Sequence, residues 1–143
     1  MIDEKDPDLR FPVVIWGTDF LFKAESYAAL ERGSKSDFKR LKGQALKGCI
    51  RLLDTQGVVY QIVDINQKSY NGLIDRLLGS VRNDYVYHKE KSLNVSGCKI
   101  MLNSLIERRL RHDRENFELL KVQTRISEAR SVAEVVMAMP LTF

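Results

Sequence analysis

The apolar residues of this chain fall into short runs separated by turn-forming residues, and the clearest pair of runs lies within residues 48–65. Asp54 and Gly57 mark the ends of the four residues between these two runs. Aspartate favours the first position of a type I turn, because its side chain bonds the backbone two residues on, and glycine accepts the left-handed conformation that closes the turn. The flanks are rich in β-branched and aromatic residues, as strands prefer. This pattern predicts a β-hairpin.

The second strand of this hairpin has apolar residues on both faces, since side chains alternate along a strand. One face carries Val58, Tyr60 and Ile62, and the other carries Val59, Val63 and Ile65. A strand that is apolar on both faces is typical of the centre of a sheet that is covered on both sides. We therefore expect the hairpin to be scaffold rather than site.

The segment before the hairpin predicts a second pair of strands. Residues 1–10 are polar and acidic and predict a flexible lead-in. Residues 12–16 are an apolar run that predicts a buried strand. Residues 20–22 predict its hairpin partner across the turn formers of residues 17–19, although a helix capped within that turn is the alternative.

A short helix and a basic stretch follow this strand pair. Residues 26–32 predict the helix, and Gly33 is a typical stop for it. The basic stretch, residues 33–47, predicts either a loop or a short helix, because its glycine and serines favour a loop whereas Phe38 and Leu41 have helical spacing.

Five more elements are predicted after the central hairpin. Residues 71–78 predict a helix with a leucine-rich stripe, and residues 84–88 predict a short aromatic strand. A longer helix is expected over residues 96–113, and a strand over residues 120–126, where apolar and polar residues alternate. Residues 131–138 predict a last helix, because they open with the spacing of a capping box.

Together these elements predict a single α+β domain over residues 1–143, with a mostly antiparallel sheet of about five or six strands and three or four helices. Hydrophobic residues make up 44% and charged residues 29% of the chain, a composition that excludes wholesale disorder. No apolar run approaches the roughly 18 residues of a membrane helix, and the N-terminus has no signal-peptide pattern. With two cysteines and no disulfide framework, the chain is expected to be soluble and cytoplasmic.

The net charge of +4 is unevenly distributed along the chain. Residues 32–51 hold seven basic and one acidic residue, and residues 81–114 hold eight basic and four acidic residues, whereas residues 1–31 carry a net charge of −4. Clustered charge of this kind steers a partner, although a solvated helix face or loop is the plainer interpretation. The candidate partner-binding residues are Lys35, Lys39, Arg40, Lys42, Arg108, Arg111 and Arg114.

No catalytic, metal-binding or cofactor-binding residue is predicted. Cys98 is the best nucleophile candidate, because the start of a helix lowers a thiol pKa and His88 and Asp84 lie nearby in sequence. The alternative is a buried core cysteine, which is a common fate for this residue type. The histidines and cysteines form no close pair of the kind that zinc requires, and the chain lacks the glycine-rich phosphate-binding motifs.

Residues 13–65 resemble small bacterial immunity proteins, which are encoded as partners of polymorphic or contact-delivered toxins. The resemblance rests on Asp19-Phe20-Leu21-Phe22, the short helix from Ser26 to Glu31, and the pattern Gly48…Asp54-x-x-Gly57-x-x-Tyr60. It implies a cytoplasmic, non-enzymatic α+β domain that covers a toxin's active site. We therefore expect a non-catalytic protein-binding module with a protein partner, such as a toxin domain, and no membrane. The alternative is a nucleic-acid-binding protein that uses the same basic residues.

Overall fold

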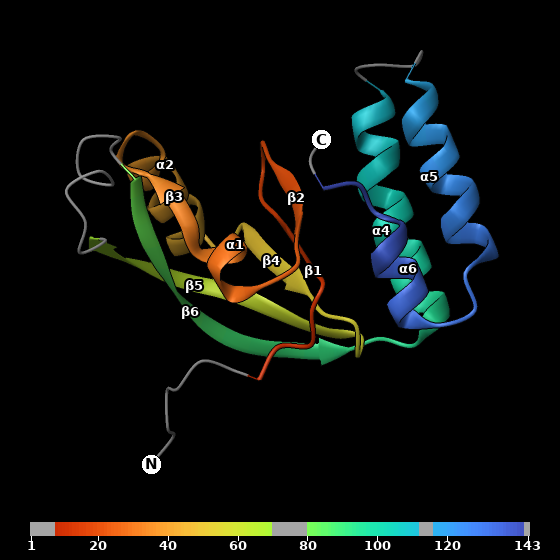
Figure 1. Cartoon of the computed structure of the whole chain (residues 1–143), viewed down its shortest axis with the longest axis horizontal. Helices are drawn as coiled ribbons and strands as arrows, with labels where there is room; N and C mark the ends of the chain where they lie inside the picture. Colours follow the sequence, from red (N-terminus) through yellow and green to blue (C-terminus); the bar gives the residue numbers. More distant parts are fainter. Residues whose placement is uncertain (1–7, 70–79, 112–115, 142–143) are drawn as a thin grey trace.

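The computed structural model describes residues 8–69, 80–111 and 116–141 (Figure 1). These residues form one six-stranded antiparallel sheet and five helices, which confirms the predicted α+β class. The helix predicted at residues 71–78 and the candidate Arg114 lie outside the described residues. The strands are β1 (Val13–Trp16), β2 (Leu21–Ala24), β3 (Arg32–Ser34), β4 (Ile50–Leu53), β5 (Val58–Ser69) and β6 (Ser80–Ser92). The helices are α1 (Tyr27–Glu31), α2 (Lys35–Leu46), α4 (Val95–Leu110), α5 (Phe117–Glu128) and α6 (Val132–Ala138).

The strand order is β2-β1-β4-β5-β6-β3, so the predicted hairpin β4–β5 does occupy the centre of the sheet. Its turn forms as expected. Asp54 Oδ1 accepts hydrogen bonds from the backbone N–H groups of Gln56, at 2.9 Å, and Val58, at 3.0 Å. Gly57 closes the turn with φ of 85°. Figure 1 shows that the long strands β5 and β6 lie side by side and are curved along their length.

A bulge in β5 overturns part of the predicted side-chain alternation. Ile62 and Asp64 pair with successive residues of β6, so Val63 is an extra residue with no partner opposite it. The extra residue shifts the alternation by one position. As a result Ile62 and Ile65 enter the same core, and Val63 is 36% exposed, although Val63 and Ile65 were predicted to share a face.

Helices cover both faces of the sheet. Val13 and Ile15 of β1 belong to a core that includes residues of α1 and α2. Val14 and Trp16 belong to a second core, with α4, α5 and α6. Figure 1 shows these two groups of helices on opposite sides of the β1–β2 hairpin.

The basic stretch forms helix α2, so the loop alternative was wrong for most of residues 33–47. Ser34 caps the helix, since its Oγ accepts a hydrogen bond from the Asp37 N–H at 3.3 Å. Phe38 and Leu41 pack against the core beneath α2, as their helical spacing indicated. The serines that suggested a loop therefore mark the start of the helix.

Gly33 does not end a helix, contrary to the prediction. Helix α1 stops at Glu31, and Gly33 lies in β3 opposite Val81. A Cβ at Gly33 would lie 2.4 Å from the Asn83 side-chain nitrogen. Any larger residue here would require the buried Asn83 side chain to move, so glycine allows the β3 backbone to lie close to that amide.

The strand predicted over residues 120–126 was wrong, because these residues belong to α5. Leu119, Val122 and Ile126 are buried at helical spacing against the C-terminal core. Leu120, which the alternating pattern placed on the covered face, is 41% exposed. Asn116 caps the helix by accepting a hydrogen bond from the Leu119 N–H at 3.2 Å.

The remaining elements follow the predictions with changed boundaries. Strand β6 is longer than the predicted residues 84–88, and α4 begins at Val95 behind an Asn94 cap. Helix α6 begins as predicted, with Ser131 Oγ accepting from the Glu134 N–H at 3.1 Å. In a capping box the Glu134 carboxylate would accept from the N–H of the cap residue Ser131. Here it accepts instead from the N–H of the preceding residue, Arg130, at 2.6 Å.

Residues near both ends of the described chain are hydrogen-bonded to other elements, to α1 near the N-terminus and to β2 near the C-terminus. Leu9 is 4% exposed, and its N–H donates to the Tyr27 hydroxyl at 3.0 Å, so the expected flexible lead-in does not extend to this residue. The Leu141 carbonyl accepts a hydrogen bond from the Lys23 N–H at 2.9 Å, which covers the outer edge of β2.

Candidate partner-binding surface at the β1–β2 turn

The turn between β1 and β2, residues 17–20, is closely packed against neighbouring side chains. The Gly17 N–H donates to the Phe20 carbonyl at 3.0 Å. A Cβ at Gly17 would lie 2.3 Å from Gln44 Oε1 and 2.4 Å from the Phe20 ring. Glycine therefore lets helix α2 and the Phe20 ring approach the backbone of the turn.

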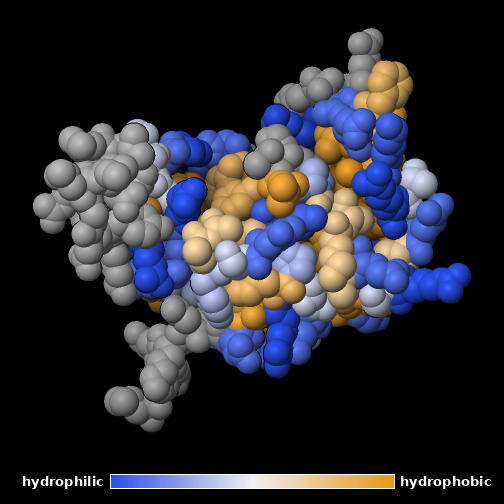
Figure 2. All heavy atoms as spheres, viewed as in Figure 1, coloured by the Kyte–Doolittle hydropathy of each residue, from blue (hydrophilic) through white to orange (hydrophobic). Residues whose placement is uncertain are grey.

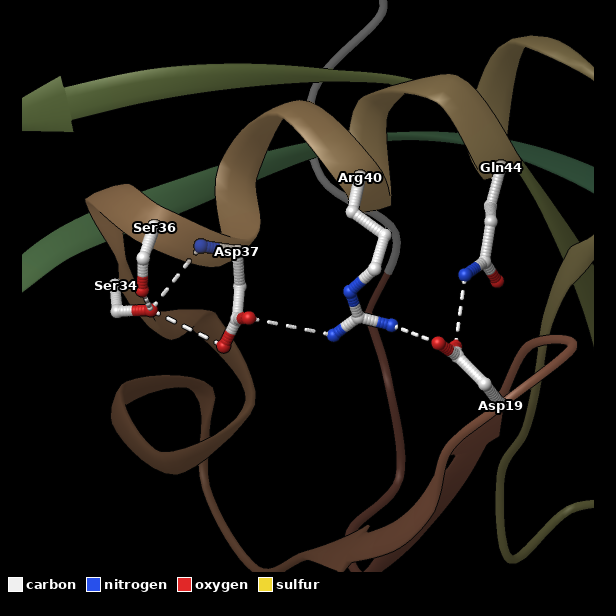
Figure 3. Close-up of polar contacts among 6 residues, drawn as sticks. All are labelled: Asp19, Ser34, Ser36, Asp37, Arg40 and Gln44. Atoms are coloured by element: carbon white, nitrogen blue, oxygen red, sulfur yellow. Dashed lines mark hydrogen bonds and ion pairs between the residues drawn. The ribbon is translucent and has the colours of Figure 1, made fainter.

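Two side chains of α2 hold this turn in place (Figure 3). Gln44 Oε1 accepts from the Thr18 N–H at 3.0 Å, and its Nε2 donates to Asp19 Oδ1 at 2.8 Å. Arg40 donates to the other oxygen of the Asp19 carboxylate. The tip of the turn is thus fixed by contacts to a helix that lies more than 20 residues further along the chain.

Arg40 also ties the turn to the start of α2. Its second guanidinium nitrogen lies 3.4 Å from Asp37 Oδ1, and Ser34 Oγ donates to Asp37 Oδ2 at 3.1 Å. The hydrogen bond from Gln44, followed by the charge of Arg40, holds the pKa of Asp19 below its ordinary value of 3.8. Asp19 is therefore a carboxylate at neutral pH whose charge is already paired within the protein.

A hollow of about 140 Å³, which we call the α4 pocket, lies between this turn and the last turns of α4. Its lining combines apolar and aromatic residues with two arginines. The residues that matter here are Trp16, Phe20, Leu21, Leu105, Arg108 and Arg109. Figure 2 shows hydrophobic residues exposed in the notch between the two groups of helices, with hydrophilic residues around them.

A second hollow of about 190 Å³, the α2 pocket, lies on the opposite side of the turn. It too combines aromatic rings with arginines, and Phe20 lines both pockets. Its main lining residues are Phe20, Phe22, Arg32, Arg40 and Tyr85. Burial raises the pKa of Tyr85 to about 12, so its hydroxyl stays protonated.

The four candidate residues on α2 divide into two kinds. Arg40 and Lys42 are used inside the protein: Arg40 pairs with Asp19 and Asp37, and Lys42 lies 3.3 Å from Asp64 Oδ1. Lys35 and Lys39 are exposed, and neither has an ion pair among the residues that the structure describes. The basic stretch thus presents less free charge than its sequence indicated.

The candidates on α4 separate in a similar way. Arg108 lines the α4 pocket, whereas Arg111 is the exposed C-cap residue of α4 and is not part of the lining. Arg109, Trp16 and Phe20 also line this pocket, and they were not among the candidate residues indicated by the sequence. One signal was present for Arg109, because it falls on the apolar side of the α4 stripe rather than with the other arginines.

Cys98 does not have the environment of a nucleophile. Its side chain is fully buried in the core beneath α4, and burial raises the pKa of its thiol above the ordinary value of 9.0. The described ranges contain no group of three or more His, Cys, Asp or Glu side chains placed to hold a metal ion. None of the helices in these ranges has the length and apolar character needed to cross a bilayer.

Comparison of the chain with protein-family models, with curated proteins and with solved structures found no match.

Proposed function

We propose that this chain is a non-catalytic protein-binding module of the bacterial immunity type, which neutralises a toxin by direct binding. The observation that carries the proposal is the β1–β2 turn: it is held rigid by Arg40 and Gln44, and each side of it has a pocket lined by arginine and aromatic side chains. A cytoplasmic location belongs to the same proposal.

The composition of this surface is typical of protein interfaces. Tryptophan, tyrosine and arginine are the residue types most enriched among interface hot spots. The two pockets together bring Trp16, Tyr85, Arg32, Arg108 and Arg109 to one region around the turn. A turn that is already fixed loses little conformational entropy when a partner binds.

The size of the pockets favours side chains of a protein partner over a small-molecule ligand. Ligand and cofactor sites commonly enclose roughly 300–1,000 Å³. The α4 pocket and the α2 pocket enclose about 140 and 190 Å³. Each is therefore suited to a single inserted side chain.

The free charge at this surface favours an acidic partner. Arg32, Arg108 and Arg109 line the pockets and have no ion pair among the described residues, and Lys35 and Lys39 add positive charge on α2. Complementary charge would speed association with an acidic surface and make it sensitive to salt.

Nucleic-acid binding remains the alternative, with weaker support. Phosphate recognition needs several free cations along one track. Arg40 and Lys42, two of the four candidates on α2, already have carboxylate partners within the chain.

The test is capture of a partner by the tagged protein from the cells in which it naturally occurs, followed by mass spectrometry. The Arg108→Glu/Arg109→Glu variant is compared with a control that changes charge equally, Lys91→Glu/Arg125→Glu, at exposed residues that line neither pocket. Thermal melts verify that both variants fold.

We expect the wild type and the control to retain one protein that the pocket variant loses, with binding that weakens as salt rises. We also expect that protein to be toxic when expressed alone and harmless when co-expressed with this chain. Equal capture by all three forms would place the interface elsewhere. A mobility shift with duplex or single-stranded oligonucleotides at low salt, without a captured protein, would favour the nucleic-acid alternative.

A further inference from the structure

Two arginines, Arg108 and Arg109, line the α4 pocket without an ion pair among the described residues. Among the residues that the structure describes, four other arginines have carboxylate partners within 4 Å: Arg10, Arg40, Arg51 and Arg82. Arg108 and Arg109 have no such partner among the described residues, although both line the same pocket.

Asp19 lines this pocket too, but its carboxylate is already engaged. One oxygen accepts from Gln44 at 2.8 Å and the other accepts from Arg40. The pocket therefore keeps a net positive character even with Asp19 in its wall.

The rest of the lining includes apolar side chains, while Arg108 and Arg109 are themselves exposed to solvent. Trp16 is 8% exposed and Leu21 is 9% exposed, and Phe20 and Leu105 are partly buried beside them. A carboxylate beside apolar walls interacts more strongly with a cation than it would in bulk water. Arginine forms strong, often bidentate, hydrogen bonds with carboxylates.

From these observations we propose that the α4 pocket binds an aspartate or glutamate side chain of the partner, paired with Arg108 and Arg109. An apolar or aromatic neighbour in the partner packs against Trp16, Phe20 and Leu105. The inference rests on the proposed protein-binding function and specifies the chemistry of the partner: an acidic residue beside an apolar one.

Arginines in the last turn of a helix also stabilise it by interacting with the helix dipole, and that role needs no ligand. Arg111 offers the matched control, because it sits at the C-cap of the same helix but does not line the pocket. Arg111→Gln removes a charge from the helix end and leaves the pocket intact, whereas Arg108→Gln/Arg109→Gln removes the pocket charge.

The experiment uses the fluorescence of Trp16, which is the only tryptophan of the chain and lines the pocket. The full-length protein is titrated with the blocked peptide N-acetyl-Phe-Glu-amide and with its uncharged analogue N-acetyl-Phe-Gln-amide. N-acetyl-phenylalanine, which carries a backbone carboxylate, is the third probe. Each titration is run at low and high salt, and thermal melts establish that every variant is folded.

We expect a saturable change in Trp16 emission with the glutamate peptide and binding that is roughly tenfold weaker for the glutamine peptide. The change should weaken with salt, fall at least tenfold in affinity in Arg108→Gln/Arg109→Gln, and stay within twofold of wild type in Arg111→Gln. Equal responses to both peptides, no response, or an unchanged double variant would overturn the assignment. A response to N-acetyl-phenylalanine alone would overturn the assignment of an acidic side chain and would indicate that the pocket binds the carboxylate of a chain terminus.

Failure of this inference can be told apart from failure of the proposed function. If a captured partner still binds Arg108→Gln/Arg109→Gln with unchanged affinity, the protein-binding function stands and the pocket assignment is wrong. If the glutamate peptide binds in the pocket but no protein is ever captured, the pocket chemistry stands and the proposed function is wrong.

Discussion

Replacing Gly57 with alanine should destabilise the fold strongly, although the change adds a single methyl group. Gly57 closes the β4–β5 turn with φ of 85°, a conformation that side-chain-bearing residues rarely adopt. The added Cβ would lie 2.2 Å from the carbonyl oxygen of Leu93, just before α4. The Leu93 N–H also donates to the Gly57 carbonyl at 2.7 Å, so the two backbones are bonded at this point. A backbone oxygen cannot rotate away, and the methyl group must push the turn and the loop apart.

The size of the effect follows from these contacts. The left-handed conformation costs alanine about 1–2 kcal/mol. Weakening the bond between Leu93 and Gly57 adds about 1 kcal/mol. The total of about 2–3 kcal/mol corresponds to a fall in Tm of roughly 10 °C for a chain of this size.

Gly43→Ala is the matched control, because it makes the same chemical change inside α2. A Cβ at Gly43 would meet no atom within 4 Å, and alanine is better than glycine in a helix by about 1 kcal/mol. Gly43→Ala should therefore raise the Tm while Gly57→Ala lowers it, as measured by circular dichroism on heating. A Gly57→Ala protein that melts at the wild-type temperature would refute the close approach of the turn to Leu93.

Three further predictions concern single side chains. Asp54 is 1% exposed and accepts two backbone hydrogen bonds. Asp54→Ala should therefore lower the free energy of unfolding by about 2–3 kcal/mol in guanidinium titrations, whereas Asp54→Asn, which keeps an acceptor, should lower it less. Equal losses in the two variants would contradict this role of Asp54. The lowered pKa of Asp19 means that its carboxylate adds stability above its ordinary pKa of 3.8, and that this stability is lost as pH falls through the folded-state pKa. Asp19→Asn should therefore reduce the fall in Tm between about pH 5 and pH 2, and an unchanged pH profile would count against the pairing with Gln44 and Arg40. Cys98 is fully buried and its thiol pKa is raised, whereas Cys49 is partly exposed. Iodoacetamide at mildly alkaline pH should therefore label Cys49 first, as measured by mass spectrometry of peptides. Preferential labelling of Cys98 would contradict its burial.

Elements with local signals were predictable from the sequence. The β4–β5 hairpin depends on Asp54 and Gly57, which lie within four residues and make their own turn. The starts of α1 and α6 depend on Ser26 and Ser131, each of which bonds a backbone N–H three residues on. Such contacts form wherever the local sequence allows them, so a single stretch of chain is enough to indicate them.

Elements shaped by distant contacts were not predictable in the same way. The alternation at residues 120–126 was compatible with a strand, but the C-terminal core required Leu119, Val122 and Ile126 on one helical face. The extra residue Val63 in β5 is defined only by its pairing with β6. Intrinsic preferences are weak, and tertiary packing overrides them.

The candidate surface shows the same division. The sequence alone indicated which segments were basic and that Arg108 was a candidate, because charge and helical spacing can be read from neighbouring residues. The tertiary structure decided which charges are free: it paired Arg40 with Asp19 and Lys42 with Asp64, and it left Arg108 and Arg109 beside Trp16. The physical reason is that the energy of a charge depends on the groups around it in space, and folding sets those groups.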